Sequence, residues 1–458
     1  MKFRMVAALA VVALSWFPAA TQAAGQADTA QEFMLKNGMK IIVKEDHRAP
    51  TVAHMIWYRV GSMDEVNGRT GLAHALEHMM FKGTKTLKPG EFSKRVAALG
   101  GRENAFTNKD YTAYFQQIEK SKLEKVMALE ADRMANLQFD KNEFAKEIRV
   151  VMEERRWRTD DQPIPLVYEA LYAAAFNAHP YHHPVVGWMN DLQNMTVADA
   201  RSWYDHWYAP NNATMVVAGD VDPQQVHKLA EKYFGKVARK DVPVTRPQDE
   251  PQQRGIRRVT VKAPAENPYV VLAFKAPTLR DVEKDADSHA LDVLAAILDG
   301  YDNARLNAKL VRTDKVANSV GAGYNNVSRG PSVFLLDGTP AKGVTTEQLE
   351  KLLRAEVERV AREGVSEEEL NRVKSQLVAS QIYKRDSVFG QAMEIGTTEM
   401  SGLSYKQIDR IIEKLKEVTA DQVKAVAQKY FGDDSLTVAT LVPLPITEKK
   451  APPAGLRH

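Results

Sequence analysis

Two histidines four residues apart, with a glutamate directly before the second, are the residues of this sequence best suited to chemistry. They are His74, Glu77 and His78 within the segment 72–81. On a helix, residues i and i+4 lie on the same face, so both imidazoles can bind one metal ion with Glu77 beside them. The flanking residues are apolar, and histidines in such surroundings are costly unless they bind something. The spacing predicts a buried metal-binding helix for peptide hydrolysis; a chance surface pattern is the alternative, since short motifs recur.

A further metal ligand must come from elsewhere in the chain, because catalytic zinc has three protein ligands and an open position for water. The acidic segment 143–155 is predicted to be helical and contains Glu147, Glu153 and Glu154. Glu147 and Glu154 are about two turns apart and share one stripe, whereas Glu153 lies roughly 120° from Glu147. If Glu147 and the ligand both face the metal helix, the ligand is Glu154. Spacing alone does not decide between Glu153 and Glu154.

Glu77 is the natural general base of such a site. Zinc lowers the pKa of its bound water to about 7 and polarises a carbonyl oxygen. Glu77 can take a proton from the water as it attacks the scissile carbonyl, and return it to the leaving amine. The chain contains no cysteine, so histidine and carboxylate must hold the metal, and this donor set suits zinc. We expect one zinc ion per chain.

The length, the net charge and the N-terminus of the chain limit the classes of protein to which it can belong. A chain of 458 residues predicts two or three domains. The formal net charge is only +3, which gives no reason to expect nucleic acid or an anionic membrane as a partner. Lys2 and Arg4 precede a short apolar core and small residues up to Ala24. This pattern predicts a signal peptide over residues 1–24 and a periplasmic or secreted protein. The alternative, a membrane anchor, would need about 20 apolar residues.

Apolar periodicity and turn residues predict the order of the elements. Asn37-Gly38 between alternating flanks predicts a hairpin over 33–44. Further strands are expected at 52–60, 102–107, 112–118, 213–219, 259–261 and 269–275. Helices are expected at 71–81, 89–99, 122–136, 142–158, 289–298, 346–362, 367–385 and 420–430, with one ending at 207.

The two halves of the chain are related. Residues 195–200 and 208–214 can be laid on 418–423 and 430–436 with an offset of 223 (419 − 196), give or take one residue. A repeat of this length indicates duplicated domains. The same offset places His74 near residues 293–298, where there is no His or Glu, so the second half lacks the metal site.

The repeat predicts the domain organisation and the fold class. We expect a metal-binding domain at 25–235, a proline- and glutamine-containing linker at 236–258, a metal-free homologous domain at 259–447 and a flexible tail at 448–458. Each half contains strands followed by helices. The predicted class is therefore α+β, with two homologous α/β sandwiches built on mixed, mainly antiparallel sheets.

On these motifs the chain resembles the pitrilysin/insulinase family of zinc peptidases, which includes the mitochondrial processing peptidases. Its His-Xaa-Xaa-Glu-His order is that of the inverzincins. Segment 71–84 matches the metal helix of the family, and 100–107 followed by 110–114 resembles its substrate-binding edge strand. The resemblance implies that the two halves form half of a clamshell around an enclosed chamber. It also implies that His74, His78 and Glu154 are the zinc ligands. By the same resemblance, Glu77 would be the general base and Glu147 a supporting acid.

The resemblance further implies how a peptide binds. The substrate would add as a β-strand to the edge that contains Asn104, Ala105, Phe106 and Thr107. Backbone hydrogen bonds then give affinity with little demand on sequence. The alternative for this segment is an ordinary paired strand.

One departure from the family concerns substrate binding near the zinc. Complete family enzymes present an Arg and, seven residues on, a Tyr from a metal-free domain. Arg305 and Arg312 are available here, but the Tyr position falls on Ser319, or on Asn318 with a one-residue shift, and Tyr324 lies too far along. The resemblance therefore implies a heterodimer with a homologous zinc-free subunit that carries the Arg/Tyr pair. A homodimer is the second choice.

The sequence favours an exported zinc endopeptidase that acts on peptides or unfolded polypeptides. A non-catalytic chamber subunit of a peptidase heterodimer is the alternative, but such a subunit has no reason to keep His74, Glu77, His78 and Glu154 together. A metal-storing or metal-sensing protein is a third hypothesis. It would need no general base, so Glu77→Gln would be silent in that case.

Overall fold

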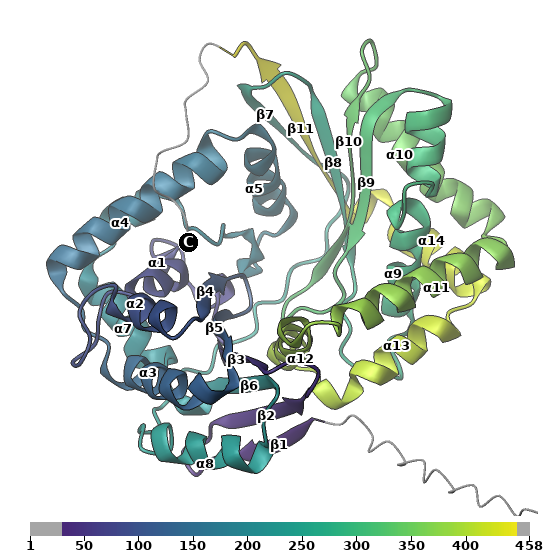
Figure 1. Ribbon diagram of the computed structural model, residues 1–458. Helices are drawn as coiled ribbons and strands as arrows, with labels where there is room; N and C mark the ends of the chain where they lie inside the picture. The colour runs from purple at the N-terminus through teal and green to yellow at the C-terminus, as the bar shows by residue number, and fades with distance from the viewer. Residues whose placement is uncertain (1–29, 447–458) are drawn as a thin grey trace, which may run out of the picture.

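The computed structural model describes residues 30–446, which fold into two α/β domains, each with one mixed sheet (Figure 1). The predicted α+β class with two homologous sandwiches is confirmed. The predicted signal peptide (1–24) and the predicted tail (448–458) lie outside the described residues. No helix within 30–446 combines the length and the apolar character needed to cross a bilayer.

The first domain contains a six-stranded sheet in the order β1-β2-β6-β3-β5-β4. β2 and β6 are parallel, and all other neighbours are antiparallel. The predicted hairpin is confirmed, since β1 and β2 pair antiparallel around Gly38, whose φ of 89° favours glycine. The strands are β1 (Gln31–Met34), β2 (Lys40–Glu45), β3 (Thr51–Tyr58), β4 (Arg102–Thr107), β5 (Thr112–Glu119) and β6 (Ala213–Gly219).

Eight helices alternate with groups of strands in this domain. Most of them pack their apolar faces on one side of the sheet, in a core that includes Leu76, Met127 and Trp203. They are α1 (Leu72–Met79), α2 (Glu91–Ala98), α3 (Leu123–Asn136), α4 (Lys141–Arg155), α5 (Pro163–Ala175), α6 (Met189–Asn194), α7 (Val197–Trp207) and α8 (Pro223–Tyr233). A π-helical turn, Arg156–Asp160, continues α4.

The second domain repeats this arrangement with a five-stranded sheet in the order β7-β11-β8-β10-β9, in which β7 and β11 are the parallel pair. Its strands are β7 (Arg257–Pro264), β8 (Tyr269–Ala276), β9 (Ala317–Tyr324), β10 (Ser332–Pro340) and β11 (Leu436–Leu444). Its helices are α9 (Ala286–Asp299), α10 (Thr346–Glu363), α11 (Glu367–Lys384), α12 (Val388–Ser401), α13 (Ile408–Glu417) and α14 (Ala420–Tyr430).

The predicted internal repeat is confirmed by element positions. α7 and β6 begin at Val197 and Ala213, whereas α14 and β11 begin at Ala420 and Leu436. Both pairs are 223 residues apart (420 − 197 and 436 − 213). The repeat therefore extends from sequence to the placement of a helix and the sheet strand that follows it.

Each domain contributes one helix that packs on the sheet of the other domain. α5 covers the face of the second sheet, where Leu171 is buried with Val271 and Leu441 (Figure 1). α12 covers the outer face of the first sheet, where Ile395 is buried with Trp57. The two helices begin 225 residues apart (388 − 163), close to the repeat offset. They are therefore equivalent elements that are exchanged between the domains.

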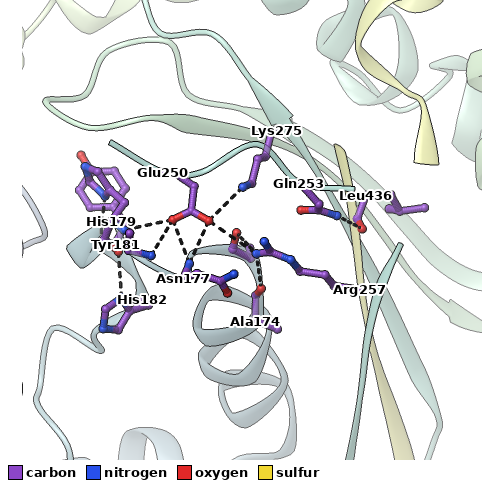
Figure 2. Close-up of polar contacts among 12 residues, drawn as sticks. Ala174, Asn177, His179, Tyr181, His182, Glu250, Gln253, Arg257, Lys275 and Leu436 are labelled. Carbon is purple, nitrogen blue, oxygen red and sulfur yellow. Dashed lines mark hydrogen bonds and ion pairs between the residues drawn. The ribbon is translucent and has the colours of Figure 1, made fainter. Parts of the chain in front are cut away.

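The segment between α8 and β7 contains no helix or strand, but a buried carboxylate fixes it in place. The Glu250 carboxylate accepts hydrogen bonds from the backbone N–H groups of Asn177, Ala178 and His179, at 2.9, 2.9 and 3.1 Å (Figure 2). Lys275 Nζ on β8 lies 3.1 Å from the same carboxylate. The segment is thus attached to a loop of the first domain and to the sheet of the second.

Candidate metal centre

Carboxylates fix the amino-terminal ends of the two helices that carry the candidate ligands. α1 starts after Gly71, and the buried Glu65 carboxylate accepts hydrogen bonds from the N–H groups of Gly71 and Ala73, both at 2.8 Å. α4 is capped by Asp140, whose side chain accepts from two N–H groups of its first turn. These caps satisfy helix-end donors and set where each helix begins.

The predicted ligands come together between these helices. The ligand atoms of His74, His78 and Glu154 lie within 4.8 Å of one another, and no other such group of three occurs among residues 30–446. Glu154 Oε2 is 3.8 Å from His74 Nε2 and 3.3 Å from His78 Nε2. Glu153, the other candidate by spacing, has a 59% exposed side chain that pairs with Arg156. The phase of α4 therefore turns Glu154, not Glu153, toward the histidines.

The residues present fit a zinc ion. Glu154 Oε2 is buried and accepts no hydrogen bond of regular geometry from the described residues, although it faces both imidazoles. A divalent cation held by these three side chains would give this oxygen a partner. Two imidazole nitrogens and one carboxylate oxygen form a donor set of catalytic zinc, which leaves a further position for water.

Charged groups around the cluster orient two of its members. Glu147 Oε2 lies 3.3 Å from His78 Nδ1, and Lys82 Nζ lies 2.6 Å from Glu147 Oε1. Arg158 Nη1 lies 2.7 Å from Glu154 Oε1, the oxygen turned away from the histidines. Neither Lys82 nor Arg158 was predicted from the sequence to be part of the site. Arg158 could have been found, because it stands four residues after Glu154 on the same helical face.

The electrostatics of the cluster show strong mutual attraction. Burial alone would lower the pKa of His78, but its close contacts with the carboxylates of Glu147 and Glu154 raise this pKa to about 9. Burial would raise the pKa of Glu154, but His78, His74 and Arg158 lower it to about 2. A cation bound at the cluster must therefore displace protons from the imidazoles, since metal ligands bind deprotonated.

The candidate base is tied to the edge of the sheet. Thr107 Oγ1, at the end of β4, donates a hydrogen bond of 2.6 Å to Glu77 Oε2. Burial raises the pKa of Glu77, and the Thr107 hydrogen bond opposes this rise. The sequence predicts Thr107 as a substrate-binding residue, and this stays a prediction. In addition, its side chain links the strand and the candidate base.

β4 is an edge strand beside a cavity of about 800 Å³ that contains the metal cluster. It pairs with β5 on one side only, so its other edge carries unpaired backbone groups among the described residues. Phe106 points to the opposite face, where its ring packs against Trp57. The residues that line the cavity and belong to the predicted site are His74, Glu77, His78, Asn104, Ala105, Phe106, Thr107, Glu147 and Glu154.

The structure does not bring the two predicted arginines to this cavity. Arg305 forms a double hydrogen bond with Glu369 on α11, at 2.8 and 2.5 Å. Arg312 lies in the π-helical turn Asn307–Thr313 of the second domain. Neither arginine lines the cavity.

The protein has two duplicated α/β domains, and one of them carries a His-Xaa-Xaa-Glu-His helix that can bind a metal ion. This is the architecture of the two-domain inverted-motif peptidases. Residues 40–187 match the profile described as "Insulinase (Peptidase family M16)", and residues 194–377 match "Peptidase M16 inactive domain". The zinc protease PqqE of Helicobacter pylori is 34% identical over 418 residues, which cover 89% of this chain and 92% of that protein. The chain belongs to the M16 (insulinase) peptidase family.

Solved structures agree with this assignment. A protease from Helicobacter pylori superimposes with a TM-score of 0.86 and 31% identity, over 91% of this chain and 100% of that one. The periplasmic protease PqqL of Escherichia coli has a TM-score of 0.77 at 19% identity, over 90% of this chain and 47% of that one. The latter likeness concerns the fold alone.

Proposed function

We propose that the protein is an exported zinc-dependent endopeptidase that hydrolyses peptides or unfolded polypeptides. The observation that carries the proposal is the cluster of His74, His78 and Glu154 beside Glu77, which Thr107 links to the free edge of β4. The Helicobacter pylori relative is named a zinc protease, which supports proteolysis. The signal-like N-terminus supports export.

In this proposal each residue has one task. His74, His78 and Glu154 would hold a zinc ion, which when bound would supply Lewis-acid chemistry and lower the pKa of water. Glu147 orients His78 through its Nδ1 atom. Glu77 takes the proton of the attacking water and returns it to the leaving amine. The backbone of Asn104, Ala105, Phe106 and Thr107 binds the peptide as an added strand.

Glu77→Gln tests the proposal. The amide cannot take a proton, so we expect peptide turnover to be lost while one zinc ion per chain remains bound. Metal content and cleavage of a peptide library are measured on the same sample. Glu153→Gln is the matched control, because Glu153 is exposed on the neighbouring helix and should leave both unchanged. Turnover that survives in Glu77→Gln would show that another group is the base.

We also infer that the chain needs a partner for full activity. The metal cluster is present, but residues 318 and 319 on β9 are Asn and Ser where the family pattern has Tyr. A homologous zinc-free subunit with the Arg/Tyr pair would complete the site, and a homodimer is the runner-up. Adding such a subunit should raise kcat/KM. Full peptidase activity of the isolated chain, unchanged by the addition, would contradict this inference.

A non-catalytic chamber subunit is the second candidate function. The match of residues 194–377 to the inactive-domain profile favours it. This candidate predicts zinc binding without turnover, with or without a partner. In either case we expect domains at 25–235 and 259–447 joined by residues 236–258, and limited proteolysis within 236–258 would test this organisation.

A further inference from the structure

Glu103 is an acidic residue of β4 to which the reaction outlined above gives no task. Side chains along a strand alternate between its two faces, so Glu103 shares a face with Ala105 and Thr107. Thr107 on this face reaches Glu77, and Ala105 packs into the core that contains α1. Glu103 lines the catalytic cavity together with Ser93 of α2. It therefore lies beside any peptide that adds to the edge of β4.

The carboxylate of Glu103 is only partly satisfied. Its Oε2 atom is buried and has no hydrogen-bond partner among the described residues. Burial raises its pKa, and a hydrogen bond with Ser93 opposes this rise. A buried carboxylate oxygen without a partner is costly. This unpartnered oxygen does not stabilise the fold. A ligand that donates a hydrogen bond to it would remove the cost.

Arg133 is a cation whose charge acts on Glu103 and lowers its pKa, but its hydrogen bonds go elsewhere. The Arg133 guanidinium donates to Glu130 at 2.5 and 3.0 Å and lies 4.2 Å from the centre of the Phe92 ring. Its Nη1 atom has no hydrogen-bond partner among the described residues. Arg133 therefore leaves the Oε2 atom of Glu103 without a hydrogen-bond donor.

The other acidic residues around the cavity have partners or tasks. Glu147 pairs with Lys82, and Glu154 pairs with Arg158 at 2.7 Å. Glu169 pairs with Arg155 at 2.8 Å, and Glu77 is the proposed base. Glu103 is thus the acidic group that a basic side chain of a bound peptide would meet.

The direction of the added strand decides whether Glu103 lies beside peptide residues before or after the scissile bond. Antiparallel addition to β4 continues the β4–β5 arrangement and is the slightly more stable mode. Residues after the scissile bond then lie toward Arg102, and residues before it lie beyond Thr107. We propose that Glu103 is a specificity residue that binds an arginine or lysine among the first three residues after the scissile bond. This proposal rests on the proposed peptidase function.

Two peptides of identical composition test the proposal. One carries a single arginine two residues after the scissile bond, and the other carries it two residues before. We expect kcat/KM of the wild-type protein, with its partner if one is required, to favour the first peptide by roughly tenfold, because hydrogen bonds to charged groups are strong. Equal values, or a preference for the second peptide, overturn the proposal.

Glu103→Gln separates specificity from a structural role. The glutamine keeps a hydrogen bond to Ser93, so the fold should survive, and the melting temperature checks this. The preference between the two peptides should vanish, whereas a structural role would lower both rates equally. Glu91→Gln is the matched control, because Glu91 pairs with Arg95 and does not line the cavity. A preference that persists in Glu103→Gln overturns the proposal.

Binding provides a readout that does not depend on turnover. In a Glu77→Gln background, fluorescence anisotropy compares the Kd of both peptides with and without Glu103→Gln. Tighter binding of the first peptide, lost in the double variant, upholds the role of Glu103 even if the wild type cleaves nothing, in which case the proposed function alone fails. Equal affinities, or no binding of either peptide, overturn the role of Glu103.

Discussion

Glu147 stands outside the proposed ligand set but contacts one of its members. Its carboxylate lies between His78 Nδ1 and Lys82 Nζ, so it fixes the ring orientation and the tautomer of His78. Groups in this position usually change metal affinity as much as they change activity. The metal centre therefore depends on a residue that donates no ligand atom.

Glu147→Gln should lower zinc affinity by about ten- to a hundredfold, because the charge that supports His78 is lost. Competition with a chromophoric chelator measures the affinity. Glu143→Gln on the same helix removes a charge that only pairs with Lys146 near the surface, and should leave the affinity unchanged. Equal affinities of the Glu147→Gln variant and the wild type would contradict the supporting role.

Thr107→Val should lower kcat about tenfold with a smaller change in KM, because the hydrogen bond that aligns Glu77 is lost. Thr107→Ser keeps the hydroxyl and should retain most of the activity. Steady-state kinetics on one peptide measure both constants. If the serine variant is as impaired as the valine variant, the methyl group and not the hydroxyl matters.

Spacing sufficed to predict some of the candidate site residues but not others. His74 and His78 follow from the i,i+4 rule within one helix. The choice between Glu153 and Glu154 needed the rotation of α4 relative to α1, which depends on packing. Lys82 contacts a residue 65 positions away (147 − 82), and no local pattern carries such a contact.

At the level of elements, the sequence patterns did not predict α5 and α12 as helices, nor the shorter helices α6, α8 and α13. The apolar faces of α5 and α12 pack against the sheet of the other domain, so no pattern within their own domain explains them. Gly390 and Gly396 also lower the intrinsic helix propensity of α12. Tertiary contacts across the domains stabilise both helices.

Gly396 is required for the close approach of α12 to the first sheet. A Cβ atom there would lie 2.0 Å from Trp57 Cε2. Alanine in place of helical glycine normally stabilises by up to about 1 kcal/mol, but here we expect a loss of about 1–3 kcal/mol from overpacking. Urea unfolding measures the change.

The Trp57→Leu substitution provides the control for this prediction. It removes the ring that the new methyl group would strike, so the double variant should lose less than the sum of the single variants. A more stable Gly396→Ala variant would contradict the close contact.

At the scale of the whole molecule, the Glu250 side chain connects the two domains. Its side chain is 6% exposed, and it reaches backbone donors of one domain and Lys275 of the other (Figure 2). Burial would raise the pKa of Glu250, but backbone hydrogen bonds from residues 177–179 and the contact with Lys275 lower it from 4.5 to about 2. A group with a lowered folded-state pKa stabilises the fold above its unfolded pKa.

Glu250→Gln should therefore lower the melting temperature near pH 7, because hydrogen bonds to a charged acceptor are weakened. The difference from the wild type should shrink as the pH falls from about 4.5 toward 2, where the wild-type carboxylate becomes protonated. Thermal unfolding across this range measures it. Asp249→Asn, which changes an exposed neighbour, is the control. A difference that does not depend on pH would contradict the ionic role.

The two-domain architecture could be predicted from the sequence because the duplication leaves similar segments at a constant offset. The offset of 223 between the halves matched the positions of α7 with α14 and of β6 with β11. The contacts of Glu250 could not be predicted in this way, because they join three distant segments that no repeat relates.

The exchange of α5 and α12 also sets the time at which the first domain can finish folding. Trp57 lies 331 residues before the start of α12 (388 − 57). At roughly 5–20 residues per second of synthesis, the apolar outer face of the first sheet waits about 20–70 s for its cover. During that interval the nascent chain presents a surface that chaperones bind and that promotes aggregation. The amino-terminal domain is therefore synthesised first but completed only after most of the second domain has been made.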